Sequence, residues 1–564
     1  MTEQEKYNYW LEQENIDQEV LNQLKLMEGN ENEIFESFYK DLEFGTAGLR
    51  GILGAGTNRM NIYTVGKASE GFAKYLKENF KSPSIAIAYD SRINSELFAW
   101  VSARIMAKNG IKVYIYSELM PTPMLSYALR HYKCDGGIVI TASHNPAKYN
   151  GYKVYGPDGC QAGPEMADAI LTYINKTDMF KVELADKNDK NINIIPDSVV
   201  EGFVDAILKK RVYEAKDAVK NLNIVYTPLN GTGRRPVDLV MKKMGVKNIS
   251  VVKEQEMPDG NFPTCSYPNP EIREALEKGL ELLEKTNGDI LIATDPDADR
   301  VGVAVKHNGD FRLITGNEMG VLMLDYICRA KTLNGTMPKN PVAVKTIVTT
   351  AMVDAVTQKY GVKLESVLTG FKFIGGVIAE LEENNRLDDY LLGFEESYGY
   401  LFLGEYVRDK DAISAVMLIA DMTAYYKSKG KTLVDVLEDM FKEFGYYENK
   451  TVTFAFEGAS GLKKMASIME QLRQAPPKSV AGADIIETSD YKLSITKNKH
   501  GETPILLPKS NVLAYKLSDG CSFVVRPSGT EPKLKIYMFV KGESQQKAKS
   551  RVEEMYSSIK TLIQ

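Results

Sequence analysis

Three aspartates at alternating positions are the first feature of the sequence that points to chemistry. Asp295, Asp297 and Asp299 come shortly after the apolar run ILIA (290–293), so they lie where a buried strand is expected to end. Carboxylates spaced in this way can converge on one hard cation, and Mg²⁺ characteristically adds phosphate oxygens to a few protein carboxylates. An EF-hand is excluded because its glycine position would be Arg300. The segment predicts a magnesium site whose phosphate partner Arg300 clamps, with a solvated acidic turn as the alternative.

A serine follows another apolar run, in the segment TASHNP (141–146). Ser143 has His144 beside it and Lys153 shortly after it. A hydroxyl becomes a nucleophile only when neighbouring groups activate it. The sequence around Ser143 has no GxSxG elbow and no evident aspartate for a triad. A loop-capping serine and a nucleophile both fit this residue, and the unusual length of the polar segment favours the nucleophile.

Two further polar loops give weaker signals when each is taken alone. Glu395 and Ser397 follow a third apolar run (GFEESYG, 393–399) and suit hydrogen bonds to sugar hydroxyls, although a capped helix start looks similar. The segment RPSGTEPK (526–533) offers a guanidinium, two hydroxyls and a glycine, which suit a phosphate; a plain β-turn is the alternative. The phosphate-binding candidates are Arg526, Ser528, Gly529 and Thr530.

The elements that must hold these loops repeat three times along the chain. In each repeat a short apolar run opens the unit, helix-like sequence follows, and a second apolar run ends in a polar loop. This alternation predicts α/β units with a largely parallel sheet, in which loops at the carboxyl ends of strands bind ligands. The opening runs begin at Ser84, Asn223 and Pro341, and the second runs begin at Gly136, Gly288 and Asp389.

The repeats suggest where the domains begin and end. Residues 1–43 have helical spacing of apolar residues and are expected to form an arm that packs on the first domain. Three similar α/β domains with mixed, largely parallel sheets are expected at 44–205, 206–321 and 322–445, carrying the serine, aspartate and glutamate loops. Residues 446–564 contain shorter strand-like runs and a closing helix, which predicts a smaller α+β domain with the RPSGT loop.

Composition and charge remove several functional classes. The 564 residues are 44% hydrophobic and 26% charged, as in globular proteins, and a net charge of −5 provides no general attraction for nucleic acid. The five cysteines are scattered without a CxxC pair, which favours reduced thiols and a cytoplasmic location. No apolar run approaches the roughly 18 residues of a membrane span. The absence of GxxxxGK[ST] and of a strand-linked GxGxxG argues against nucleotide-driven phosphoryl transfer and dinucleotide redox chemistry.

The four loops together resemble those of the α-D-phosphohexomutase superfamily, which includes phosphoglucomutases and phosphomannomutases. TASHNP, DPDADR, EES and RPSGT occur in the family's order and at family-like separations, and FGTAGLRG (44–51) resembles the start of its first domain. The resemblance implies four domains around a central cleft, each giving one loop. It also implies an isomerase that moves a phosphoryl group within a small-molecule sugar phosphate, with a mobile fourth domain.

The resemblance further implies a role for each matching residue. Ser143 would be the phosphoserine, whose oxygen joins the three aspartates around Mg²⁺. Lys153 and His144 match positions for proton transfer and active-site support, while Arg50 lies near the active site and Arg300 offsets phosphate charge. The expected substrate contacts are Glu395 and Ser397 at the sugar, Thr369, Gly370, Lys372 and Lys345 from the third domain, and Arg526, Ser528, Gly529 and Thr530 at the distal phosphate.

The segments that choose the sugar narrow the expectation. GTAGLRG, TGFKFIG and EESYG are more similar to glucomutase-type and phosphopentomutase-type members than to bacterial phosphomannomutases, and Tyr398 stands where some of the latter have histidine. We expect interconversion of glucose 1-phosphate and glucose 6-phosphate through phosphoserine, with glucose 1,6-bisphosphate as intermediate and activator. Phosphopentomutase or phosphomannomutase activity, a catalytically silent sugar-phosphate-binding protein, and a metal-dependent phosphatase with an aspartate nucleophile are the alternatives.

Overall fold

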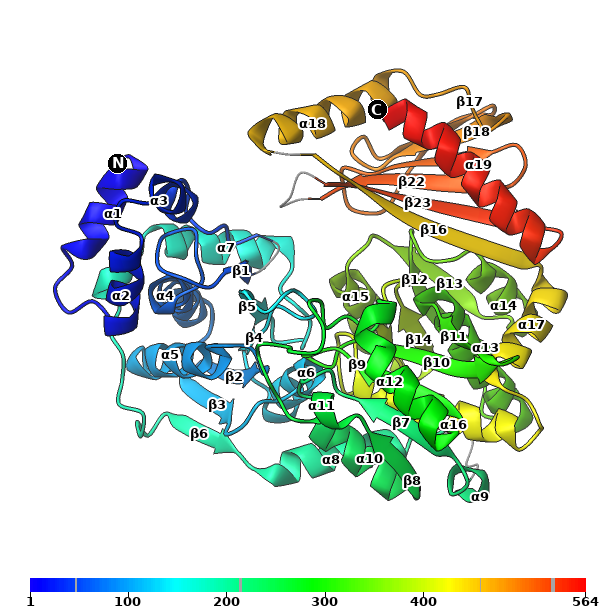
Figure 1. Cartoon of the computed structure of the whole chain (residues 1–564), viewed down its shortest axis with the longest axis horizontal. Coiled ribbons are helices and arrows are strands. Elements are labelled where there is room, and N and C mark those ends of the chain that lie inside the picture. Colours follow the sequence, from blue (N-terminus) through cyan, green and yellow to red (C-terminus); the bar gives the residue numbers. More distant parts are fainter. Residues whose placement is uncertain (46–47, 213–215, 457, 529–532, 564) are drawn as a thin grey trace.

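Four β-sheets follow one another along the chain in the computed structural model (Figure 1). It describes residues 1–564 except 46–47, 213–215, 457, 529–532 and 564. Each sheet with its helices is called a domain below. The first three domains combine parallel and antiparallel strands, and the fourth is antiparallel. The predicted fold class is confirmed.

The first domain has the strand order β1-β5-β4-β2-β3-β6. Strands β4, β2, β3 and β6 are parallel, whereas β5 is antiparallel to both β4 and β1. The apolar runs predicted as strands are completely buried, as expected for a sheet covered on both faces. The strands are β1 Gly48–Ile52, β2 Ser84–Tyr89, β3 Lys112–Tyr116, β4 Gly136–Ile140, β5 Tyr149–Tyr155 and β6 Ile192–Ile195. The main helices are α4 Ile62–Asn79, α5 Ser95–Lys108, α6 Thr122–Tyr132, α7 Pro164–Asn175 and α8 Asp197–Leu208.

The second and third domains repeat this plan with fewer strands. Their orders are β11-β10-β9-β7-β8 and β13-β12-β14-β15. The second contains β7 Asn223–Thr227, β8 Asn248–Val251, β9 Ile290–Thr294, β10 Val301–His307 and β11 Asp310–Ile314, with α10 Arg234–Met244 and α12 Arg273–Thr286. The third contains β12 Val342–Thr346, β13 Lys363–Val367, β14 Tyr390–Phe394 and β15 Tyr400–Leu401, with α13 Gly316–Leu333, α14 Met352–Tyr360, α15 Phe371–Glu383, α16 Ala412–Lys427 and α17 Leu433–Phe444.

One feature of the three sheets places the site loops. In each domain a buried parallel strand turns directly into an antiparallel neighbour, as β4 into β5, β9 into β10, and β14 into β15. The three connections, 141–148, 295–300 and 395–399, carry the serine, aspartate and glutamate motifs. The polar loops are therefore reversals at the carboxyl ends of buried strands. The boundaries expected at 205 and 321 fall within α8 and α13, and α13 packs on β14, α14 and α16.

The fourth domain is an antiparallel sheet with helices on one face (Figure 1). Leu513, Phe523 and Ile536 face helices α18 and α19 in its core, while Val524 and Tyr537 on the other face pack with Val348 of the third domain. The main elements are β16 Tyr446–Ala455, α18 Gly458–Gln474, β18 Ala483–Asp490, β19 Ile495–Asn498, β20 Gly501–Pro504, β21 Leu513–Leu517, β22 Ser522–Pro527, β23 Lys533–Gly542 and α19 Gln545–Ile563.

The N-terminal arm consists of three short helices, α1 Glu3–Leu11, α2 Gln18–Leu26 and α3 Glu31–Phe38. Trp10 and Phe38 are buried in a cluster that also includes Phe180 of the first domain, so the arm packs on that domain. Among the helices of the described chain, none is both long and apolar enough to cross a membrane.

Candidate active site

Ser143 lies in the β4–β5 loop with its hydroxyl directed at the second domain. Its Oγ donates a hydrogen bond to Asp295 Oδ2 at 2.8 Å and lies 3.2 Å from His144 Nδ1. The side chain is buried, and the backbone N–H donates to Thr141 Oγ1 at 2.8 Å. Its φ of 53° is in the left-handed region that non-glycine residues seldom adopt. The loop thus directs one hydroxyl at one carboxylate across a domain boundary.

The three aspartates of the β9–β10 loop are buried and each offers a carboxylate oxygen, all of them within 4.8 Å of one another. Lys153 Nζ donates to Asp297 Oδ2 at 3.2 Å, and Lys410 Nζ lies 3.1 Å from Asp299 Oδ2. By contrast, Asp297 Oδ1 and Asp299 Oδ1 are buried without a hydrogen-bond partner among the described residues. Because buried polar atoms are normally satisfied, these two oxygens beside Asp295 fit a hard cation.

Burial and mutual repulsion set the charge of this loop. Burial, with the charges of Asp297 and Asp299, raises the pKa of Asp295 well above its ordinary value. Burial acts on Asp297 too, but the charge of Lys153 and a hydrogen bond with Asp295 outweigh it and hold the pKa of Asp297 below its ordinary value. A divalent cation would relieve this repulsion, so the electrostatics favour the same ligand as the geometry.

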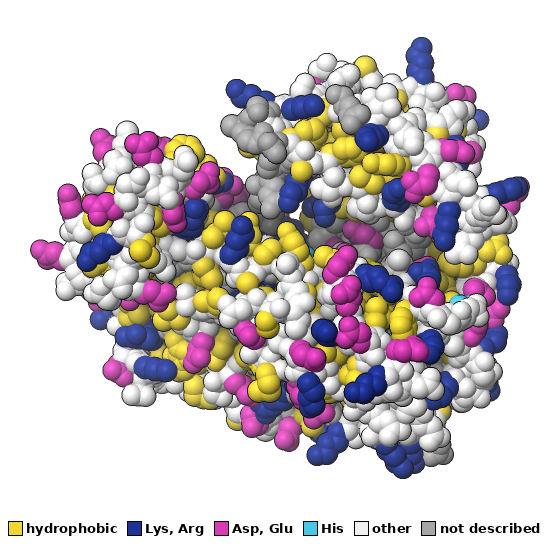
Figure 2. All heavy atoms as spheres, in the orientation of Figure 1, with side chains coloured by type: hydrophobic (Ala, Val, Ile, Leu, Met, Phe, Trp, Pro, Cys, Tyr) yellow, Lys and Arg dark blue, Asp and Glu magenta, His cyan; other side chains and the backbone are white. Residues whose placement is uncertain are grey.

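His144, Arg50 and Lys153 line one hollow together with Ser143 and Arg300. Burial, with the positive charges of Arg300 and Arg50, lowers the pKa of His144 well below its ordinary value, so its imidazole is neutral near pH 7. The hollow has a volume of about 550 Å³ and also reaches the N-terminal arm. Figure 2 shows a deep recess between the surfaces of the first and fourth domains. The structure thus brings together five of the residues expected to act in catalysis.

Lys410 is a site residue that the sequence analysis missed. Its Nζ bridges Asp299 Oδ2 at 3.1 Å and Asp409 Oδ1 at 3.2 Å, and it lies 5.3 Å from the Phe371 ring centroid. Burial would lower the pKa of Lys410, but Asp299 and Asp409 raise it above its ordinary value, so the ammonium stays charged. The third domain therefore supplies a cation to the aspartate loop. The run RDKD (408–411), with its alternating charges, was the available signal.

The sugar-loop residues lie beside the aspartate loop. Arg300 Nη1 donates to Ser397 O at 2.7 Å and to Glu271 Oε1 at 2.9 Å, so it ties the β14–β15 loop to the second domain. Glu395 Oε1 accepts a hydrogen bond from the Gly370 N–H at 2.9 Å. Arg300, expected as a phosphate clamp, is thus also a bridge between two loops. The Glu395–Gly370 contact places two expected substrate residues side by side.

The remaining third-domain candidates have different surroundings. Thr369 Oγ1 is buried without a hydrogen-bond partner in the described chain. Lys372 is the second residue of α15, and burial lowers its pKa. Both have capacity for a ligand. Lys345, by contrast, donates to Asp354 Oδ2 within its own domain, and its Nζ lies 3.4 Å from Thr350 O. The structure therefore places Lys345 in an ion pair with Asp354.

Arg526 stands near the end of β22, and Ser528 directly follows this strand. Arg526 hydrogen-bonds Tyr537 of β23, and the Ser528 N–H donates to Lys533 O at 2.7 Å. Burial raises the pKa of Tyr537, and the charge of Glu396 in the sugar loop raises it further. Tyr537 therefore links the end of β22 electrostatically to the sugar loop. Gly529 and Thr530, the other two phosphate-binding candidates, lie outside the described residues.

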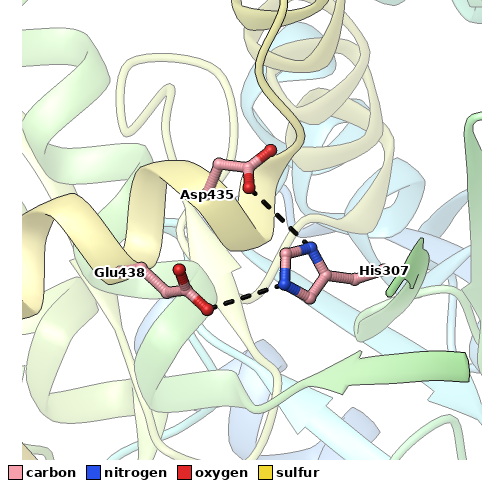
Figure 3. Close-up of side chains that lie close together, drawn as sticks. All are labelled: His307, Asp435 and Glu438. Carbon is pink, nitrogen blue, oxygen red and sulfur yellow. Dashed lines mark ion pairs between the residues drawn. The ribbon is translucent and has the colours of Figure 1, made fainter. Parts of the chain in front are cut away.

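A second group of possible metal ligands lies between the second and third domains (Figure 3). His307 ends β10, and Asp435 and Glu438 lie on α17. Asp435 Oδ1 is 3.8 Å from His307 Nδ1, whereas Glu438 Oε1 is 3.6 Å from Nε2. The two carboxylates thus face opposite edges of one imidazole, an arrangement that suits an interdomain ion pair better than a single chelated cation.

Families of known domains match this chain over most of its length. Phosphoglucomutase/phosphomannomutase domain families match in order: the α/β/α domains I, II and III at residues 41–181, 201–309 and 315–444, and the C-terminal domain at 465–558. The chain belongs to the phosphoglucomutase/phosphomannomutase family. The family resemblance read from the four loops is therefore confirmed, and the protein is an isomerase of the phosphohexomutase type.

Relatives named phosphoglucomutase align with almost the whole chain. The phosphoglucomutase of Staphylococcus haemolyticus (strain JCSC1435) is 36% identical over 514 residues, covering 89% of this chain and 91% of that protein. The phosphoglucomutase of Staphylococcus aureus (strain N315) is 36% identical over 513 residues, covering 90% and 91%. The fold of a Paramecium phosphoglucomutase, pp63/parafusin, in its open form superposes with a TM-score of 0.66 at 18% identity, covering 93% of this chain and 95% of that one.

Proposed function

We propose that this enzyme interconverts glucose 1-phosphate and glucose 6-phosphate through a phosphoserine at Ser143 and a bisphosphorylated sugar. The observation that carries the proposal is the Ser143 hydroxyl, which lies 2.8 Å from a carboxylate of the buried aspartate cluster. The phosphoglucomutase name of relatives at 36% identity supports glucose as the sugar. Phosphoryl transfer needs alignment and neutralisation of charge more than covalent chemistry from the protein, and this arrangement offers both.

Asp295, Asp297 and Asp299 are the residues that we propose to hold Mg²⁺, because two of their buried oxygens have no hydrogen-bond partner in the described chain. The ion would neutralise charge on the phosphoryl group attached to Ser143. Lys153 and Lys410 hold the remaining carboxylate oxygens of Asp297 and Asp299. Their role is to fix the direction of the carboxylates.

The protein's own groups then provide alignment and proton transfer. In the proposed first half, the Ser143 phosphoryl passes to the free hydroxyl of the sugar monophosphate; the P–O bond to Oγ breaks and the new P–O bond forms on the sugar. Lys153 and His144 are the proposed carriers of the hydroxyl proton, since both line the hollow and His144 is neutral. The bisphosphate turns end for end, and its other phosphoryl returns to Oγ.

The other candidates hold the sugar during this turn. We assign Glu395 and Ser397, with the segment from Thr369 to Lys372, to the sugar hydroxyls, and Arg526 with its loop to the distal phosphate. Arg300 joins the aspartate and sugar loops through its hydrogen bond to Ser397 O. Lys345 is a weaker candidate, because Asp354 already pairs with its ammonium.

A side-by-side assay tests the substrate. The enzyme receives Mg²⁺ and a trace of glucose 1,6-bisphosphate, then the 1-phosphate of glucose, mannose, glucosamine or ribose, and released phosphate is followed in the same tubes. Glucose 1-phosphate should turn over fastest by tenfold or more, which is about 1.4 kcal/mol in barrier. A faster ribose or mannose substrate would reassign the enzyme within the family. Failure to isomerise any of the four would refute the mutase proposal.

Ser143→Ala tests the nucleophile. We expect a loss of about 10³-fold or more, because the variant has no oxygen to carry the phosphoryl group. Ser102→Ala is the matched control: Ser102 is also buried in the first domain, and its hydroxyl donates to Phe98 O away from the site. Equal activity of Ser143→Ala and wild type, with phosphate released, would favour a phosphatase with an aspartate nucleophile. If folded wild-type protein turns over none of the sugar phosphates, the result would favour a catalytically silent sugar-phosphate-binding protein.

A further inference from the structure

One buried arginine grips the backbone of the Ser143 loop. Arg92 is 3% exposed, and its two terminal nitrogens reach four carbonyl oxygens, three in this loop and the fourth at Tyr149, the first residue of β5. Nη2 donates to Ser143 O at 2.5 Å and also to Asn145 O, while Nη1 donates to Pro146 O at 3.0 Å and Tyr149 O at 2.9 Å. A single guanidinium therefore fixes most of the segment that carries the proposed nucleophile.

Arg92 is itself held from two domains. Its Nε lies 3.4 Å from Asp90 Oδ2, with both side chains fully buried, and its guanidinium carbon lies 5.0 Å from the Phe262 ring centroid. Phe262 belongs to the second domain, is 3% exposed and has a φ of 47°. The neighbouring Gly260 packs so tightly that an added Cβ would come within 2.5 Å of the Ile93 nitrogen. The second domain therefore packs against the backbone at Ile93 and against the side chain of Arg92.

This contact matters because Ser143 adopts an unfavourable backbone conformation. A non-glycine residue in the left-handed region costs roughly 1–3 kcal/mol and persists only where its surroundings enforce it. The carbonyl of Ser143 itself is one of the four oxygens that Arg92 holds. A lysine cannot make the same set of hydrogen bonds, because its ammonium is a single point of charge, whereas the planar guanidinium donates from two separate terminal nitrogens.

We propose that Arg92 positions the Ser143 hydroxyl for phosphoryl transfer, and that Phe262 holds Arg92 in place from the second domain. Arg92 is a positioning residue, because its contacts are with the loop and not with the hollow where substrate would lie. The inference rests on the proposed role of Ser143. On this proposal the alignment of Ser143 depends on two contacts with the second domain. One is the hydrogen bond of Ser143 to Asp295, and the other is the packing of Phe262 on Arg92.

The test compares Arg92→Lys and Phe262→Leu with wild type. For Arg92→Lys we expect kcat to fall about 100-fold, since a displacement of about 1 Å costs that much, while KM changes by less than about threefold. Phe262→Leu should reduce kcat about tenfold and should have less effect when combined with Arg92→Lys, because both act through one contact. The rate at which glucose 1,6-bisphosphate phosphorylates Ser143, read from intact mass, should fall with kcat.

Matched controls separate positioning from stability. Arg473→Lys changes a largely buried arginine that pairs with Asp490 at 2.7 Å in the fourth domain, away from Ser143. Trp100→Leu removes a ring 4.3 Å below Lys187 on the surface of the first domain. Both should keep kcat within about threefold of wild type. Melting temperatures identify any variant that is merely unfolded, and Phe262→Leu then supplies the test if Arg92→Lys is unstable.

Two outcomes overturn the proposal. One is a folded Arg92→Lys variant with wild-type kcat and wild-type phosphorylation of Ser143; the other is an equal loss in Arg473→Lys. Neither result touches the proposed function, which is tested separately by the substrate assay and by the activity of Ser143→Ala. Conversely, an inactive Ser143→Ala with an unaffected Arg92→Lys would leave the phosphoserine mechanism standing and remove the positioning role.

Discussion

At the scale of single residues, the three site loops share an unfavourable backbone conformation. Ser143, Ala298 and Tyr398 all have positive φ angles, of 53°, 45° and 63°, and each stands in a different loop. Strained residues of this kind cluster at functional sites, where the surroundings enforce them. Arg92 holds the first loop, and Arg300 joins the second to the third. The site is therefore built by tertiary contacts acting against local preference.

A residue-scale prediction concerns Glu396. Burial, with the charge of Glu395, raises the pKa of Glu396 from 4.5 to about 8. The folded protein therefore keeps a proton that the unfolded chain has lost, so this residue lowers the stability of wild type as pH rises from 4.5 to about 8. Glu396→Gln should melt at increasingly higher temperature than wild type over this range, and the gain should level off above it.

The magnitude and control of this measurement follow from the same linkage. Each unit of pKa shift is worth about 1.4 kcal/mol at most, and partial exposure of Glu396 reduces it. Glu383→Gln on α15, which removes an exposed carboxylate, serves as the control. A difference between Glu396→Gln and wild type that stays constant with pH would show that the carboxyl is ionised throughout.

At the scale of elements, the sequence was sufficient for the two apolar strands that open and close each α/β repeat, and for the polar residues that follow them. Uninterrupted apolar runs identified β2, β4, β7, β9, β12 and β14, because a strand buried on both faces must be apolar throughout. The residues that hold the loops were not predictable in this way. Arg92 and Lys410 come from segments far from Ser143 and Asp299 in the chain. Arg92 reaches Ser143 because β2 and β4 are neighbours in the first sheet, whereas Lys410 reaches Asp299 through the packing of the third domain on the second. Likewise, the ion pair of Lys345 with Asp354 depends on how α14 packs.

An element-scale prediction concerns the support of the aspartate loop by the segment after β7. Thr232 donates from its N–H and its Oγ1 to Pro296 O at 2.8 and 2.9 Å. A Cβ added to Gly231 would lie 2.4 Å from Pro296 Cα, so Gly231→Ala must push the loop away. We expect kcat to fall about 100-fold, with a loss of about 1–3 kcal/mol in stability from overpacking.

Gly163→Ala is the matched control for this change. Gly163 precedes α7 with a φ of −72° and has no atom within 4 Å of an added Cβ. This variant should keep wild-type activity in the assay with glucose 1-phosphate. Wild-type kcat in Gly231→Ala would show that the β9–β10 loop tolerates displacement and that the close approach is not needed for its function.

At the scale of the whole molecule, the first three domains share a core and the fourth does not. One apolar cluster runs from α6 of the first domain through the second domain to α16 and α17 of the third. The fourth domain has its own core and meets the third through a small cluster that contains Val348, Val524 and Tyr537, and through the start of β16, where Tyr446 stacks on Phe441 of α17. The chain passes between them at Gly445, whose φ of 103° is open to glycine but strained for other residues. These features favour a rigid body of three domains and a fourth that rotates.

The last prediction is that substrate closes the fourth domain over the hollow. Glucose 1-phosphate bound at Ser143 should draw Arg526 and its loop inward, so the radius of gyration in small-angle scattering should fall on adding ligand to Ser143→Ala, which cannot turn it over. The double variant with Ser143→Ala and Arg526→Ala should still bind the ligand in calorimetry but should contract less. The reason is that the phosphate no longer has a guanidinium to bind in the fourth domain. An unchanged radius with saturating ligand would mean that the fourth domain is already in its binding position. In that case the bisphosphate would have to turn without any movement of the fourth domain, beside a hollow of about 550 Å³ whose lining includes Ser143 and Arg300.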